Sequence, residues 1–337
     1  MELITLLTPC YNAEKCIYRL LDSVLLQTYP HIEMIVIDDG STDGSAAIIK
    51  SYISKFEKKG YSLRYVYQKN GGQSVAIRNG LQLVNGDFLV WPDADDFFSS
   101  PKAIEIMAET LRNSSETIAL VRCSQNIVDE KDLSMIRIQT NKGQEESASF
   151  FEDCLFYKNN FYWGAGAYMV RMDILKGVTN FEIFTTKKAG QNWQLLLPVL
   201  YSYRCVSKKD VLYTVLERAD SHSRGSFVGY KEELSRICVY EKTVLETLAR
   251  IKEMPIVIKK TYCKKICLNY LMQKINLAME YNQNDDYLTF LHTLKIQYPH
   301  NYGFKLQGSF LLVRLKMMPL LKFLMHIWGE IKKEMIN

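Results

Sequence analysis

Short apolar runs alternate with segments of helical period through the first third of the chain. The runs predict strands, and the segments between them, with apolar residues at i, i+3, i+4 and i+7, predict helices. The expected strands cover residues 3–8, 32–37, 63–67, 88–91 and 118–123, and the expected helices 17–25, 48–56, 74–84 and 102–111. This alternation predicts an α/β fold with a mostly parallel sheet between helices.

Each of the first four expected strands runs into a cluster of polar or glycine residues. Tyr11 and Asn12 follow the first strand, and residues 38–43, 69–73 and 93–96 follow the next three. Ligands of such sheets bind outside the carboxyl ends of the strands. The sequence therefore predicts one binding site assembled from four turns at one edge of the sheet.

The turn at residues 93–96 carries three carboxylates. Asp93 and Asp95 project to the same side of an extended chain, where they can share a hard divalent cation or a polyhydroxyl ligand. Taken alone, the segment also fits an acidic turn in which aspartate bonds local backbone. Its place as the fourth polar turn on one edge favours the metal site.

Composition places the chain among globular proteins: 337 residues, 47% hydrophobic and 23% charged. The net charge of +5 is uneven, because residues 226–337 carry +7 and the remainder −2. A basic segment of this kind fits an anionic membrane surface, nucleic acid or no partner. Eight cysteines without a paired framework indicate free thiols in a reducing compartment. Without a signal-peptide pattern or a long apolar stretch, the expected location is the cytoplasm.

The motifs resemble the inverting glycosyltransferases of family 2, which have the GT-A fold. The matching segments are Thr8-Pro9-x-Tyr11-Asn12, 35–43, Asn70-Gly71-Gly72, 76–80, Gly86-Asp87 and 93–96. The likeness is specific over about residues 1–100, thinner through the middle and absent as motif after about residue 230. It implies a GT-A catalytic domain at 1–225, with a donor-nucleotide half (1–100) and an acceptor half (101–225), followed by a helical basic region at 226–337. No Gly-x-Gly-x-x-Gly follows the first strand, which argues against a dinucleotide dehydrogenase.

The resemblance implies a donor site built around a divalent ion, Mn²⁺ or Mg²⁺, that neutralises the departing diphosphate. Asp95 would be the direct metal ligand, with Asp93 near the ribose or the water shell of the metal. Asp39 would recognise the nucleobase and Tyr11 would stack on it. The further donor-binding residues that the resemblance implies are Thr8, Pro9 and Arg78.

The catalytic base is the point at which the chain departs from the family. Where many members have a Glu-Asp pair before an aromatic residue, this chain has Gln191, Asn192 and Trp193. An amide is no base near neutral pH, but it can orient a sugar hydroxyl. Asn192 is therefore expected to contact the acceptor beside Gln191, with Trp163 and Trp193 as walls for sugar rings or as core residues. The carboxylates and histidine available as substitute bases are Asp173, Glu182, Asp220 and His222.

The implied function is metal-dependent, inverting transfer of a sugar from a nucleotide-sugar donor, a UDP-hexose or UDP-N-acetylhexosamine, to a cell-surface polysaccharide or lipid-linked glycan. The two amides raise an alternative, a catalytically silent nucleotide-sugar-binding or scaffold protein. A nucleotidyltransferase is disfavoured, because the first turn lacks a glycine-rich triphosphate loop. The basic, apolar segment 310–328 fits either a membrane interface or terminal helices packed on the catalytic domain. A peripheral position on the cytoplasmic face of the membrane, with no nucleic-acid partner, follows from the first of these.

Overall fold

The computed structural model describes residues 1–140, 146–147, 150–159, 161–217 and 229–301. The chain divides into two compact units. The first unit comprises Met1–Gly225 and Thr243–Pro255, and the second comprises Ser226–Lys242 and Ile256–Asn337. The segment 310–328 and the candidate residues Asp220 and His222 lie outside the described residues.

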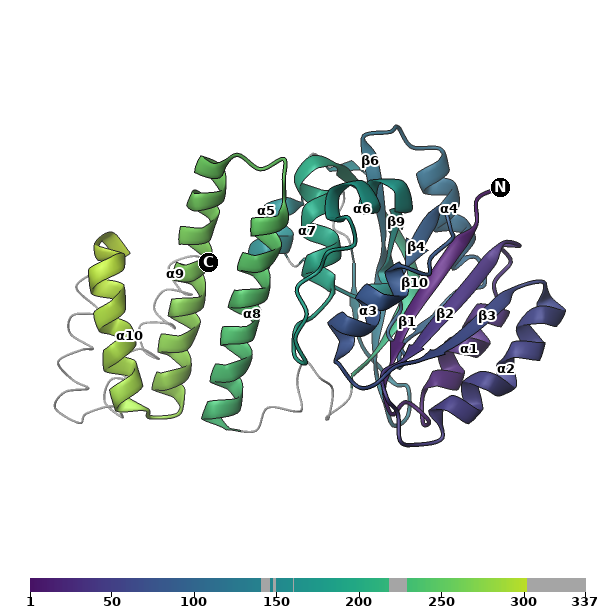
Figure 1. Ribbon diagram of the computed structural model, residues 1–337, viewed down its shortest axis with the longest axis horizontal. Helices are drawn as coiled ribbons and strands as arrows, with labels where there is room; N and C mark the ends of the chain where they lie inside the picture. Colours follow the sequence, from purple (N-terminus) through teal and green to yellow (C-terminus); the bar gives the residue numbers. More distant parts are fainter. Residues whose placement is uncertain (141–145, 148–149, 160, 218–228, 302–337) are drawn as a thin grey trace. The chain divides into compact units, whose positions relative to one another are not determined.

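The first unit is built on a ten-stranded sheet (Figure 1). The strands are β1 (Ile4–Cys10), β2 (Ile32–Asp38), β3 (Ser62–Tyr67), β4 (Phe88–Val90), β5 (Phe97–Phe98), β6 (Ile118–Asp129), β7 (Met135–Gln139), β8 (Glu146–Ser147), β9 (Tyr168–Arg171) and β10 (Arg204–Glu217). They lie in the order β3-β2-β1-β4-β9-β6-β10-β5, with β7 paired to β6 and β8 to β10. The run β3-β2-β1-β4 is parallel, as is β6 with β10.

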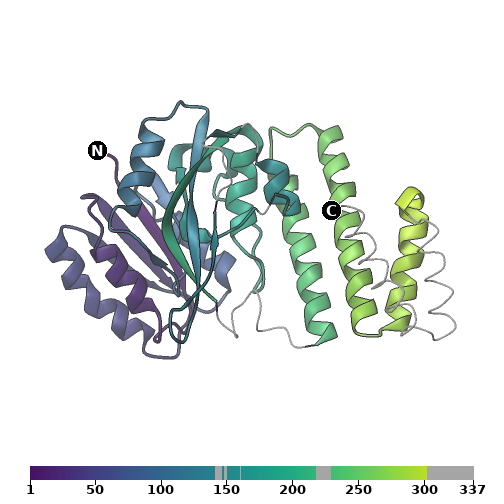
Figure 2. The same cartoon turned by 180° about the vertical axis from the view of Figure 1, so that it is seen from behind.

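Helices cover the sheet on both faces. They are α1 (Ile17–Leu25), α2 (Ser45–Lys59), α3 (Gln73–Leu81), α4 (Ala103–Arg112), α5 (Phe151–Phe156), α6 (Met172–Thr179) and α7 (Asn192–Ser202), with a 3₁₀ turn η1 (Ala165–Ala167). Right-handed crossovers in the order β3-β2-β1-β4 place α1 and α2 on one face and α3 on the other, as Figures 1 and 2 show from opposite sides. All seven residues of β1 and of β2 are buried, as expected for strands covered twice.

The α/β prediction is confirmed. Every expected strand and helix up to residue 123 is present, although α3 ends at Leu81 rather than at Val84. The sequence pattern did not predict β5, β7, β8 and β9, which pair antiparallel with their neighbours. The parallel arrangement therefore describes the first hundred residues, and the second half of the sheet is mixed.

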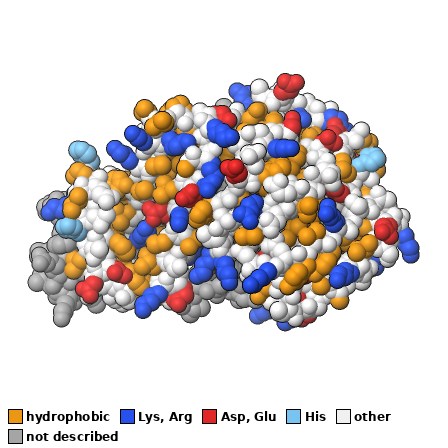
Figure 3. Space-filling view, viewed as in Figure 1, with side chains coloured by type: hydrophobic (Ala, Val, Ile, Leu, Met, Phe, Trp, Pro, Cys, Tyr) orange, Lys and Arg blue, Asp and Glu red, His pale blue; other side chains and the backbone are white. Residues whose placement is uncertain are grey.

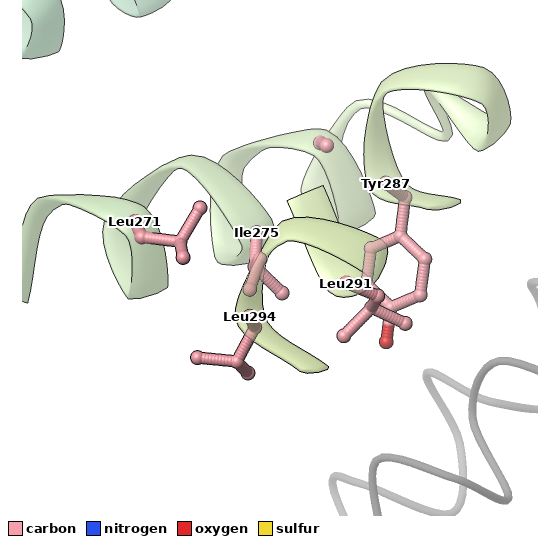
Figure 4. Close-up of a cluster of buried hydrophobic side chains, with 6 residues drawn as sticks. Leu271, Ile275, Tyr287, Leu291 and Leu294 are labelled. Carbon is pink, nitrogen blue, oxygen red and sulfur yellow. The ribbon is translucent and has the colours of Figure 1, made fainter. Parts of the chain in front are cut away.

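The second unit is helical, as expected for the basic C-terminal region. It contains the first half of α8 (Tyr230–Arg250), then α9 (Ile256–Glu280), α10 (Asn284–Gln297) and the 3₁₀ turn η2 (Pro299–Asn301). Leucine and isoleucine side chains of α9 and α10 close around Tyr287 in its core (Figure 4). The helices are also joined by polar contacts, since Tyr281 donates to Glu233 Oε1 at 2.5 Å. Among the described residues of the whole chain, no helix has the length and apolar character needed to cross a membrane.

Candidate functional site

The ends of β1, β2 and β3 are level with one another. Cys10 pairs with Asp38, and Asp38 pairs with Tyr67, so the three strands end in one row. The backbone continues this alignment into the turns, because Asp39 N donates to Cys10 O at 2.8 Å and Gln68 N to Asp38 O at 2.9 Å. The turns that follow these strands thus meet at one edge, which we call the rim.

Asp39 joins two turns of the rim by hydrogen bonds. Its carboxylate is almost fully buried and accepts from Gln68 Nε2 at 2.6 Å and from the backbone N–H groups of Gly71 and Gly72, both at 2.8 Å. A carboxylate has about four acceptor positions. Three are therefore occupied by the third turn, and Asp39 holds the glycine turn against the second one.

Gly72 shows why this turn needs glycine. Its φ is +93°, and a Cβ built there would lie 2.7 Å from the Lys187 backbone. Next to it, Ser74 Oγ donates to Thr186 O at 3.0 Å. The start of α3 is thereby packed against the loop that leads into α7, and the rim includes residues from the predicted acceptor half of the chain.

The acidic turn joins the same assembly through Asp93. Its Oδ1 accepts from Gln73 Nε2 at 2.9 Å and from Gln191 Nε2 at 3.4 Å, which connects the first residues of α3 to the residue before α7. The third carboxylate, Asp96, is buried and accepts from Leu216 N at 3.0 Å. Burial raises the pKa of Asp96 well above its usual value, and the charges of Asp95 and Asp93 raise it further. Negative charge is thus concentrated at this turn.

The oxygen-rich turn fits a hard divalent ion. Within the described ranges, no three His, Cys, Asp or Glu side chains converge tightly enough to enclose a metal by themselves. A magnesium-type ion is commonly held by one or two carboxylates and completed by substrate phosphates and water. Asp95, which is half-buried beside Asp93, meets that requirement, and a cation there would offset the repulsion felt by Asp96.

The predicted residues of β1 divide into buried and exposed members. Thr8 and Pro9 are buried within the strand, and Thr8 Oγ1 has no hydrogen-bond partner among the described residues. Tyr11 follows them in a turn fixed by Asn12, whose N–H donates to Ser41 Oγ at 3.0 Å. The Tyr11 side chain is 50% exposed, so its ring is available to a planar ligand.

Asp38, the last residue of β2, has two local partners. Its Oδ1 accepts from Ser41 N at 2.8 Å, and its Oδ2 accepts from the Tyr65 hydroxyl at 2.6 Å. Burial and this hydrogen bond raise the pKa of Tyr65. Asp38 therefore organises the second turn from beneath.

Arg78 lies apart from this group. It stands in the last turn of α3 and lines a cavity of about 700 Å³ with Lys176, Glu182 and Arg250. A second cavity of about 670 Å³ shares Lys176 and opens at the amino ends of β1 and β4, where Asp173 contributes to its wall. The structure thus places Arg78 and Glu182 at the first cavity and Asp173 at the second, rather than among the carboxylate and glycine turns of the rim.

Asn192 begins α7 and is held at both ends of its amide. Its Oδ1 accepts from Trp91 Nε1 at 2.9 Å, and its Nδ2 donates to Trp163 O at 3.0 Å. Gln191, just before it, is buried and faces Asp93. A glutamate at 191 would set a second negative charge against Asp93, whereas the amide donates to it. The two amides therefore connect the acidic turn, the end of β4 and the loop before η1.

Trp163 and Trp193 are in contact with each other. Their rings meet edge to face at 4.9 Å, and both indole N–H groups donate to Cys154, at 3.4 Å to its sulfur and 3.3 Å to its carbonyl. Tyr157 covers the outer side of Trp163 with ring centroids 4.6 Å apart, and 57% of the Tyr157 side chain is exposed. Core packing and an accessible aromatic surface are thus combined in one cluster.

Sequence reasoning missed four of these residues. Gln68 and Gln73 flank the glycine turn that the pattern singled out, but nothing in the sequence indicated which carboxylates they bind. The sequence predicted Trp91 only as the last residue of a buried strand, and Tyr157 lies in a segment without helical or strand periodicity. Gln68, Gln73 and Trp91 act through contacts with residues distant in sequence. Tyr157 instead contacts the nearby Trp163.

Comparison with known proteins agrees with this arrangement. Residues 5–177, just over half of the chain, match the profile of glycosyl transferase family 2. An uncharacterized glycosyltransferase of Rickettsia typhi is 30% identical over 140 residues, which is 42% of this chain and 42% of that protein. The chain therefore spans less than half the length of this relative.

Two solved structures share the fold. TarS 1-349 of S. aureus in complex with UDP-GlcNAc superposes with a TM-score of 0.66 at 15% identity, covering 97% of this chain and 92% of that one. The mannosyltransferase PcManGT of Pyrobaculum calidifontis in complex with GDP-Man and Mn²⁺ gives 0.50 at 14% identity, covering 94% and 87%. The fold likeness extends over nearly the whole chain, whereas the sequence match ends near residue 177. With the profile match covering the rim from β1 through β9, the chain belongs to glycosyltransferase family 2.

Proposed function

We propose that the protein is a metal-dependent, inverting glycosyltransferase that uses a nucleotide-sugar donor, a UDP-hexose or UDP-N-acetylhexosamine. The observation that carries this proposal is the bridge at Asp93, where Gln73 from α3 and Gln191 from the start of α7 bind one carboxylate oxygen. This bridge sets the predicted donor turns against the predicted acceptor segment, as transfer between two bound molecules requires.

The donor nucleotide would lie across the turns after β1 and β2. Tyr11 offers an exposed ring for the base, and Asp39 retains about one acceptor position for a ring N–H after binding its three donors. Thr8 and Pro9 support this pocket from within β1. UDP is favoured over GDP by the fold neighbour solved with UDP-GlcNAc, the more similar of the two structures.

Asp95 would hold a Mn²⁺ or Mg²⁺ ion together with the diphosphate oxygens of the donor, with Asp93 near the ribose or the water shell of the ion. When bound, such an ion acts as a Lewis acid that stabilises the negative charge on the leaving diphosphate. The chain's own contribution is to fix the carboxylates: Asp93 through Gln73 and Gln191, and the whole turn through the bond from Leu216 N to Asp96.

Asn192 would orient the acceptor hydroxyl. After bonding Trp91 and Trp163, its amide keeps one N–H and one lone pair, enough to hold a hydroxyl by one hydrogen bond. Gln191 binds Asp93 and would act on the acceptor only through that contact. Amides replace the carboxylate that usually acts as the base. Catalysis would therefore depend more on stabilising the leaving diphosphate than on removing the proton of the acceptor hydroxyl.

The acceptor would be a growing cell-surface polysaccharide or a lipid-linked glycan. Tyr157 and Trp163 form a closely packed, tilted pair with an accessible outer ring, and sugar rings present apolar faces to such surfaces. Trp193 supports Trp163 from the side. The site of action would be the cytoplasm, at the cytoplasmic face of the membrane where a lipid-linked acceptor lies.

A donor panel tests the proposal. UDP-sugars with Mn²⁺ should raise the melting temperature and release UDP slowly by transfer to water, and Asp95→Ala should lose the metal-dependent part of both. Asp173→Ala, a carboxylate at the opposite edge, serves as the matched control and should behave as wild type. If no nucleotide sugar binds with or without metal, the proposal fails.

The same panel addresses the alternative raised by Gln191 and Asn192, a silent nucleotide-sugar-binding or scaffold protein. Such a protein would bind the donor with Mn²⁺ but release no UDP, either to water or to acceptor glycans. Binding without turnover would therefore support the alternative over the enzyme.

A further inference from the structure

The first three residues of α9 have branched aliphatic side chains that are exposed to solvent. Ile256 is 72% exposed, Val257 76% and Ile258 43%. Further along the same helix, aliphatic residues such as Ile266 and Ile275 are buried. Single exposed apolar residues are common, but a contiguous exposed group marks an interaction surface.

Two lysines share the side of the helix that Ile256 and Val257 occupy. Lys260 and Lys264 follow Ile256 by four and eight residues, which places them about 6 and 12 Å along the same side of the helix. Both are exposed. We call the surface of Ile256, Val257, Ile258, Lys260 and Lys264 the α9 tip. In Figure 3, orange and blue side chains lie together over this end of α9, at the top of the view.

Helix stability does not account for this sequence. The first turn of a helix favours carboxylates, because the backbone N–H groups there carry partial positive charge. Helices α8 and α10 follow this rule with acids in their first turns. The first turn of α9 has no acid, as is also true of α1, α2, α3 and α7. Its first three side chains are nevertheless aliphatic and exposed, which helix formation does not require. Such a local departure from favourable sequence points to function.

We propose that the α9 tip docks on an anionic membrane surface. Ile256 and Val257 would insert between the headgroups and the upper acyl chains, and Lys260 and Lys264 would contact lipid phosphates. Charge complementarity selects this partner, because the lysines stand on the same helix face as the aliphatic pair. A nucleic acid backbone would match the lysines but offer no apolar environment to the isoleucine and valine.

This proposal names the membrane contact of the proposed function and rests on that function only for the lipid-linked acceptor. Docking needs neither donor nor metal. Vesicle binding and donor binding are therefore separate measurements, and each proposal can fail while the other stands.

Flotation of the full chain with vesicles tests the α9 tip. Wild type should float with phosphatidylcholine vesicles that contain a quarter phosphatidylglycerol, and much less with phosphatidylcholine alone or in high salt. Each lysine near an anionic surface changes the partition about fivefold, so Lys260→Glu with Lys264→Glu should lower it about twenty-five-fold or more. Ile256→Ser with Val257→Ser should also lower it about tenfold or more, because two aliphatic side chains lose their insertion.

Matched variants separate the tip from general charge and apolar content. Ile296→Ser removes another aliphatic side chain of the second unit that is 65% exposed, and Lys58→Glu with Lys59→Glu reverses two exposed lysines of α2. Both should float as wild type does. The proposal is overturned if wild type does not float, if the tip variants float unchanged, or if the controls lose as much as they do. A self-associating tip would appear instead as a dimer in sedimentation that Ile256→Ser with Val257→Ser dissociates without any vesicle binding, and this result would also overturn it.

Discussion

The indole N–H of Trp91 donates to Oδ1 of Asn192 at 2.9 Å, across 101 positions of sequence. Trp91 is fully buried at the end of β4, and Asn192 is the first residue of α7. The bond ties the acidic turn after β4 to the helix on which the family usually carries its catalytic carboxylate. The side-chain amide of Asn192 thus connects β4 to α7, in addition to its proposed contact with the acceptor.

Asn192→Ala should lower turnover about tenfold or more, because the acceptor hydroxyl loses its orientation. The buried Trp91 N–H would also lose its partner, which costs about 1–3 kcal/mol of stability. Steady-state UDP release and urea unfolding measure the two effects.

Trp91→Phe is the matched variant for Asn192→Ala. It breaks the same hydrogen bond from the other side and leaves the amide in place. Equal losses of turnover in both variants would mean that Asn192 acts by positioning alone. A larger loss in Asn192→Ala would support direct contact with the acceptor, and wild-type turnover there would refute any role.

Asp39→Asn should weaken UDP binding about tenfold or more and lower stability by about 1–3 kcal/mol. The new amide nitrogen would face a backbone N–H of Gly71 or Gly72, two donors with no acceptor between them. Calorimetric titration with UDP and Mn²⁺ gives the affinity. Gln68→Ala removes one donor and keeps the charge, so it should bind UDP nearly as wild type does; equal loss in both would argue against a role for the carboxylate itself.

Gly72→Ala should destabilise the protein by about 2–4 kcal/mol. The Gly72 backbone, with φ +93° and ψ 162°, lies in a region that is essentially restricted to glycine and costs a side chain about 1–3 kcal/mol, and the added Cβ would meet the Lys187 backbone at 2.7 Å. Gly60 has the ordinary left-handed backbone, with φ +82° and ψ 16°, and nothing within 4 Å of its Cβ. Gly60→Ala should therefore lose only about 1 kcal/mol, and chemical denaturation of both variants compares the rim turn with an open helix end.

The ion pair of Glu2 with Arg112 predicts a pH-dependent part of the stability. Two nitrogens of Arg112 donate to Glu2 at 2.7–3.0 Å, and this hydrogen bonding lowers the pKa of Glu2 to about 2. A lowered pKa stabilises the fold above the ordinary value of 4.5, and the contribution disappears as pH falls toward 2. Both side chains are partly exposed, so the pair should contribute no more than about 1 kcal/mol.

Glu2→Gln should therefore reduce the free energy of unfolding by up to about 1 kcal/mol at pH 7. The difference from wild type should shrink between pH 4.5 and 2. Urea unfolding across this range measures it. A difference that is constant with pH would assign the effect to packing rather than to charge.

The positions of the rim residues show how far sequence carries the prediction. Apolar periodicity located the first four strands, and a parallel sheet places their carboxyl ends on one edge, so the meeting of Asp39 and Asp93 with the glycine turn followed from local pattern. Pattern could not indicate that Asp39 would be bound by Gln68, or Asp93 by Gln73 and Gln191. These partners depend on the direction in which each side chain points, and several polar residues in each turn could have bound the same carboxylates.

Arg78 illustrates the opposite case. It lies within a motif that resembles the family, yet the structure puts it in the last turn of α3, on the wall of a separate cavity. Helix α3 runs from its start at Gln73, on the rim, toward the amino ends of the strands, and each residue adds about 1.5 Å. The direction of a crossover helix thus separates residues that are close in sequence.

The sequence by itself determined the α/β order, the four polar turns and the acidic segment, because strand and helix periods and turn residues are local properties of the chain. The tertiary structure decided the mixed second half of the sheet and the joining of Gln191 and Asn192 to Asp93 and Trp91. It also decided the exposure of Ile256 and Val257. These features depend on contacts between residues far apart in the chain, and on which faces the packing leaves uncovered, and periodicity carries no information about either.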